Sequence, residues 1–156
     1  MNQLERLKGK WLSENVRLPS TASDEEILFF QSNNKILLPF DLINYFKLLN
    51  GTQEEYDGSL FQFYSIGQVK KVKDEYKDWL GIPNYKNIVN TLIESEDYFV
   101  LANYSFHLFS YVIKLYPQNS VKNEILVICG DEYKIIANSF SEFIEFYLND
   151  SIELQL

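Results

Sequence analysis

The chain has 156 residues, of which 46% are hydrophobic and 23% charged, a balance typical of one folded domain and not of a disordered chain. Its formal net charge of −8 argues against direct binding to nucleic acid, because phosphates attract basic surfaces. The single cysteine, Cys129, and the single histidine, His107, exclude an internal disulfide and a zinc cluster built from several such ligands.

No targeting or membrane segment is predicted. The first six residues lack the basic and apolar regions of a secretion signal. No stretch approaches the roughly 18 consecutive apolar residues that a membrane span needs. We therefore expect a cytoplasmic protein without membrane contact, present as a monomer or a weak dimer.

The first part of the chain predicts helices. Residues 2–12 place leucines and Trp11 at helical spacing. The segment Ser23-Asp24-Glu25-Glu26 is a capping box, in which the Ser23 hydroxyl and the Glu26 carboxylate each accept from the other residue's amide.

The segment 37–51 is the clearest helix of the sequence. Pro39 suits the first helical position, and Asn50-Gly51 supplies a left-handed stop. The stripe between them is too apolar to face water, so we expect other elements to cover it; it consists of Leu42, Ile43, Phe46 and Leu49.

The middle of the chain mixes both kinds of pattern. Residues 59–64 are short and aromatic, which predicts a strand. Ser65 is then expected to cap a helix that ends at Gly81 and Pro83. Its apolar stripe is Ile66, Val69, Val72, Tyr76, Trp79 and Leu80. Residues 82–93 fit a short helix and an irregular strand equally well.

The last third predicts strands and a closing helix. Short connections favour antiparallel neighbours, since a parallel crossover needs a dozen or more residues. A second capping box, Ser139 to Glu142, opens the final helix. The sequence therefore predicts an α+β single domain over residues 1–156. We expect an antiparallel sheet of about five to six strands, with a mixed sheet as the alternative. The N-terminal helices and a C-terminal helix are expected to pack around this sheet. The expected strands are 98–103, 107–116, 124–129 and 133–137.

No sequence motif predicts catalysis. His107 has no motif that supplies a nucleophile and an orienting partner, and a structural or surface role is expected for it. The carboxylate pairs Glu54/Glu55, Glu94/Glu96 and Asp131/Glu132 lie in turn-like segments, where acidic residues favour solubility. The scattered glycines form no phosphate-binding loop. We expect no catalytic residue, no metal site and no cofactor.

Two acidic segments with a tyrosine are the candidate protein-binding surfaces. Tyrosine is favoured at interfaces because it buries a large area at low entropic cost. Ordinary solvated loops are the alternative interpretation of each segment. The candidates are Glu54, Glu55, Tyr56 and Asp57 in the first, and Glu94, Glu96, Asp97 and Tyr98 in the second.

The order of these segments resembles the SUKH superfamily, which includes the Smi/Knr-type cell-wall regulators of fungi and many bacterial immunity proteins. The likeness is carried by the acidic helix start after Pro19, by Leu38-Pro39-x-Asp41 with Asn50-Gly51, by Tyr64-Ser65-Ile66-x-x-Val69, and by Ile136-Ala137-Asn138-Ser139-Phe140. Residues 82–97 depart from the family pattern, which usually has a strand with small residues there.

The resemblance implies a binding protein and not an enzyme. Bacterial members typically neutralise a cognate polymorphic toxin, often a nuclease, by direct stoichiometric contact. An acidic protein suits a basic toxin domain. The alternative that the resemblance implies is a non-catalytic regulatory or scaffold module like the fungal regulators, and an uncharacterised enzyme is the third hypothesis.

Overall fold

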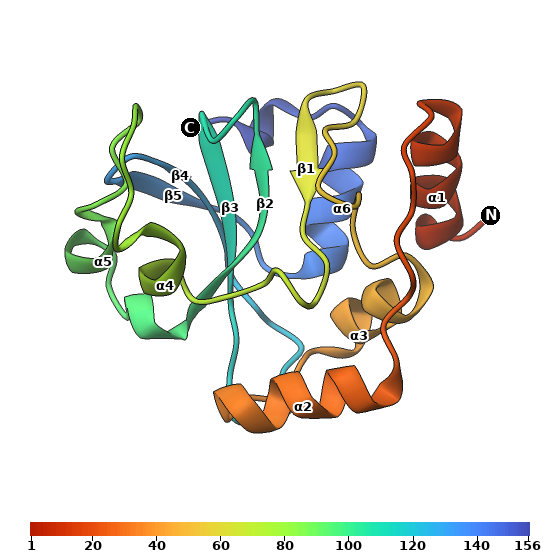
Figure 1. Cartoon of the computed structure of the whole chain (residues 1–156), viewed down its shortest axis with the longest axis horizontal. Coiled ribbons are helices and arrows are strands. Elements are labelled where there is room, and N and C mark those ends of the chain that lie inside the picture. Colours follow the sequence, from red (N-terminus) through yellow and green to blue (C-terminus); the bar gives the residue numbers. More distant parts are fainter.

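The computed structural model describes residues 1–156 and confirms the α+β class (Figure 1). A five-stranded sheet carries helices on both faces, and a single cluster of 42 buried hydrophobic residues forms the core. The helices are α1 (Gln3–Ser13), α2 (Asp24–Asn34), α3 (Phe40–Leu48), α4 (Val72–Tyr76), α5 (Ile88–Thr91) and α6 (Phe140–Leu148), with 3-10 turns η1 (Ser95–Asp97) and η2 (Ile152–Leu154). The strands are β1 (Phe61–Phe63), β2 (Tyr98–Tyr104), β3 (Phe109–Lys114), β4 (Ile125–Cys129) and β5 (Glu132–Ala137).

The sheet is an antiparallel meander in the order β1-β2-β3-β4-β5. The expected strand number is confirmed, and the mixed alternative is wrong because every neighbouring pair is antiparallel. The central strands β2 and β4 are buried along nearly their whole length, as expected for strands covered on both faces.

Neighbouring residues of β3 show how the two faces are covered. The Tyr111 ring packs against Phe143 of α6, with ring centroids 5.2 Å apart. On the opposite face, the Ser110 hydroxyl accepts a 2.6 Å hydrogen bond from Tyr76 of α4. Because side chains alternate along a strand, α6 and α4 must lie on opposite sides of the sheet. Helix α1 packs on α6, farther from the sheet (Figure 1).

Helix α3 has the buried stripe that its sequence predicts. Leu42, Phe46 and Leu49 are each 1% exposed. Pro39 is the residue before the first helical turn, and Asn50 and Gly51 both have positive φ, which confirms the left-handed stop. The Asn50 side chain accepts from the Ile66 amide at 2.8 Å and donates to the Ser20 carbonyl at 2.9 Å, so this stop also joins three segments.

The helix expected from residue 66 to residue 80 is wrong. Only Val72–Tyr76 is α-helical. Residues 66–68 form a single turn after Ser65, and the chain at Lys70 and Lys71 then pairs with β2. The Lys70 carbonyl accepts from the Val100 amide at 3.0 Å, and Lys71 forms an isolated bridge with Phe99. Pairing with the sheet therefore prevails over helical periodicity here, and Leu80, from the expected stripe, is 86% exposed.

Four smaller expectations have different outcomes. Of the two alternatives for residues 82–93, the short helix is correct, as α5. The first capping box is confirmed in both halves at Ser23 and Glu26. At α6 only one half forms, because the Glu142 carboxylate accepts from the Asn138 amide and not from Ser139. His107 lies in the turn before β3 and not in the strand.

None of the helices combines the length and the apolar character needed to cross a lipid bilayer.

Candidate protein-binding surfaces

The first acidic segment is partly tied to the body of the protein. Glu54 is exposed and has no cation within salt-bridge distance. The Glu55 carboxylate accepts two hydrogen bonds from Arg17, at 2.9 and 2.7 Å, and this contact lowers its pKa. The Tyr56 hydroxyl donates to the Asn103 side chain at 2.8 Å, and its ring packs on Phe106. Only Glu54 is therefore free to meet a partner's cation without breaking a contact.

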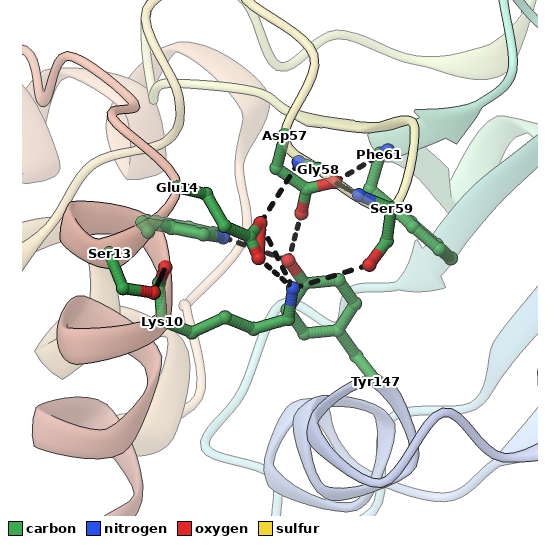
Figure 2. Close-up of polar contacts among 9 residues, drawn as sticks. Lys10, Ser13, Glu14, Asp57, Gly58, Ser59, Phe61 and Tyr147 are labelled. Carbon is green, nitrogen blue, oxygen red and sulfur yellow. Dashed lines mark hydrogen bonds and ion pairs between the residues drawn. The ribbon is translucent and has the colours of Figure 1, made fainter.

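Asp57 is buried, so its expected exposure is wrong. It is 5% exposed, and its Oδ1 accepts from the Ser59 and Phe61 amides at 2.8 and 3.0 Å. Its Oδ2 accepts from the Tyr147 hydroxyl, whose oxygen accepts in turn from the Trp11 indole at 2.9 Å. Figure 2 shows these groups converging between the 57–61 loop, α1 and α6. Such a buried carboxylate with partners on both oxygens is a structural element.

An ion pair covers this network on its outer side. Lys10 contacts Glu14 at 2.6 Å and the Ser59 hydroxyl at 3.3 Å, and its ammonium lies 5.0 Å from the centre of the Tyr147 ring (Figure 2). The Glu14 carboxylate also accepts from the Gly58 amide at 2.9 Å. The loop that carries the first candidate surface is thus fixed against α1 and α6.

The second acidic segment is also largely neutralised. Glu94 pairs with Lys114, and Glu96 contacts Lys73 at 3.0 Å and Lys71 at 3.6 Å. The hydrogen bond from Lys73 lowers the pKa of Glu96. Asp97 is exposed and has no cation nearby. The expected exposure of Tyr98 is wrong, because it is 6% exposed at the start of β2.

The surroundings of His107 give no chain of nucleophile, base and orienting group. Its Nε2 lies 3.3 Å from the Tyr64 hydroxyl, and its ring packs against Trp79, with centroids 5.0 Å apart. Burial lowers its pKa, which favours the neutral imidazole. No carboxylate contacts His107, and no group of three or more His, Cys, Asp or Glu side chains converges as a metal site would require.

A groove beside α2 was not foreseen from the sequence. It has a volume of about 550 Å³ and lies between α2 and the chain from Ile66 to Asp74. Its signal in the sequence is the run Ile27-Leu28-Phe29-Phe30, because a surface helix buries one stripe and cannot bury four consecutive apolar residues. Ile27 and Phe30 are buried, whereas Leu28 and Phe29 are 63% and 71% exposed.

The comparisons with known proteins bear on this architecture as a whole. A search among curated proteins found no match. Residues 21–145, most of the chain, match the SMI1 / KNR4 family (SUKH-1). The matched region begins just before α2 and ends within α6, so it contains the complete sheet and both walls of the groove. The chain therefore belongs to the SMI1 / KNR4 family (SUKH-1).

Proposed function

We propose that this protein is an immunity-type inhibitor that neutralises a cognate polymorphic toxin by direct stoichiometric contact in the cytoplasm. The observation that carries the proposal is the family match over residues 21–145, since the SUKH resemblance implies a binding role. We also propose that residues 1–156 form one SUKH-like domain. The packing of α1 on α6, through the Trp11–Tyr147 hydrogen bond, supports including the residues before the matched region.

The mechanism we infer is occlusion and not chemistry. A net charge of −8 produces a negative field that attracts a basic domain and raises the rate of encounter. A nuclease is one activity that suits this mechanism, because its substrate site must be basic to hold phosphates. In this mechanism the inhibitor makes no covalent change to the toxin, so one molecule blocks one toxin domain.

The proposal predicts that a toxin domain is encoded beside this gene, and co-expression with that domain tests it. We expect the protein to protect cells and to co-purify with that domain at a ratio of one to one. We also expect the complex to weaken as salt screens the charges at its rim. Lack of protection together with lack of co-purification would overturn the proposal. Recovery of several weak signalling or envelope partners instead would favour the regulatory alternative.

A further inference from the structure

The groove beside α2 has an apolar floor and one exposed aromatic wall. Phe30, Ile66 and Val69 line it and are 7%, 4% and 7% exposed, so each presents only a small surface to the opening. Phe29, which precedes Phe30 on α2, lies at the edge of the groove and is 71% exposed. Figure 1 shows α2 at the lower end of the molecule, beneath the yellow-green chain that joins β1 to α4.

One of the two lysines of this groove is paired with a carboxylate outside it. Lys71 lies 3.6 Å from Glu96, which does not line the groove. Lys70 lines the groove, is exposed and has no carboxylate within salt-bridge distance. One cation of this wall therefore remains unpaired.

The three carboxylates of the groove form no ion pair. Glu25, Glu26 and Asp74 line it, all three are exposed, and none has a basic group within salt-bridge distance. Glu26 serves only the capping box at Ser23. Glu25 lies in the first turn of α2 and Asp74 in α4, so negative charge lines both walls of the groove.

We propose that the groove receives a basic amphipathic segment of the protein partner, with an apolar side chain on Phe29 and Phe30 and separate arginine or lysine side chains paired with Glu25 and with Asp74. This inference rests on the proposed function and assigns its contact face. Charge complementarity favours this occupant: three carboxylates without an ion-pair partner and one unpaired lysine line the groove around its apolar floor, so its charge is negative on balance. Interfaces concentrate their binding energy at such aromatic anchors and use charged groups for orientation and for the rate of association.

The test compares two charge-reversed variants in binding to the toxin domain encoded beside this gene. The first variant carries Glu25→Lys and Asp74→Lys. The matched control carries Asp131→Lys and Glu153→Lys, which changes the net charge equally at two exposed carboxylates outside the groove and outside both acidic segments. We expect the groove variant to bind at least about tenfold more weakly and the control to stay within about threefold of the unaltered protein. Phe29→Ala is expected to lose at least about tenfold without a change in net charge.

Folding is checked on each variant by its circular dichroism spectrum and its unfolding midpoint. The groove residues are exposed, so their substitution leaves the core intact. Tight binding by the unaltered protein and by both groove variants would overturn this inference while the proposed function stood. Failure of the unaltered protein to bind would overturn the proposed function itself.

Sedimentation of the free protein tests a second copy of the chain as the occupant. We expect the sedimentation coefficient to be unaffected by Phe29→Ala. A dimer that Phe29→Ala converts to a monomer would overturn the proposal of a basic partner segment in this groove.

Discussion

The 54–57 segment and the groove beside α2 are both acidic and aromatic, yet the fold uses them in opposite ways. In the first, Asp57 is enclosed and both of its oxygens accept hydrogen bonds. In the second, Glu25 and Asp74 remain exposed and form no ion pair. A carboxylate that already accepts hydrogen bonds within the fold gains little from contact with a partner. An exposed carboxylate beside an apolar surface can gain an ion pair or hydrogen bond on binding. The predictions below test this distinction.

The largest effect on stability is expected from Asp57→Ala. The substitution leaves the Ser59 and Phe61 amides and the Tyr147 hydroxyl without their acceptor in a buried site. Buried donors without a partner are costly, so we expect the free energy of unfolding to fall by roughly 2–4 kcal/mol. Urea unfolding measures this. Glu54→Ala in the same loop is the matched control, with an expected change within about 0.5 kcal/mol. Equal effects of the two substitutions would mean that Asp57 is not structural.

Tyr147→Phe should have the next largest effect. It keeps the ring against Phe61 and Phe63 but removes the hydroxyl that links Trp11 to Asp57. We expect a loss of about 1–3 kcal/mol, because the Trp11 indole and one carboxylate oxygen lose their partner. Thermal or urea unfolding reports the change. A stability equal to that of the unaltered protein would show that water replaces the hydroxyl at no cost.

Glu75 combines features of the two regions. Its Oε2 is buried, as in Asp57, but has no hydrogen-bond partner. Burial raises its pKa above the ordinary value, although Lys70 opposes this. The folded protein then binds this proton more strongly than the unfolded chain, so stability is lost as the pH rises from the ordinary pKa through the raised one. We expect Glu75→Gln to increase the free energy of unfolding at neutral pH, and the gain to shrink as the medium is acidified.

Urea unfolding of this variant and of the unaltered protein between pH 4 and pH 8 measures the gain. A gain that is independent of pH would point to a packing effect. A loss at neutral pH would show that the carboxylate is stabilised by a contact that the unfolded chain lacks.

The smallest effect on stability is expected at the groove. Glu25→Gln combined with Asp74→Asn removes two exposed charges that have no cation partner, so the free energy of unfolding should change by no more than about 0.5 kcal/mol. Chemical unfolding checks this. A loss of several kcal/mol would identify these carboxylates as structural, like Asp57, and would remove the contrast between the two regions.

The sequence predicts burial better than it predicts conformation. Ile66, Val69, Val72 and Tyr76 are all buried, as the helical stripe required, but only the last two lie in a helix. Before α4, the Lys70 carbonyl accepts a hydrogen bond from the Val100 amide of β2. No local pattern shows that an adjacent strand is available as a partner.

The candidate site was predicted less well than the fold, for a related reason. Glu54 and Asp57 look alike in the sequence, and what separates them is a hydroxyl on Tyr147, far along the chain. The pairing of Glu94 with Lys114 and of Glu96 with Lys73 is equally non-local. The run of apolar residues from Ile27 to Phe30 was a local signal of the groove, since one helix face cannot bury all of it.

The central claim is that this family member acts by stoichiometric contact and not by chemistry. Titrating the activity of the proposed cognate toxin domain, which we expect to be encoded beside the gene, with the purified protein tests it directly. We predict that inhibition rises linearly and is complete at one equivalent, with the toxin recovered unmodified after the complex is dissociated. Complete inhibition at a small fraction of one equivalent, or a covalently altered toxin, would contradict the account.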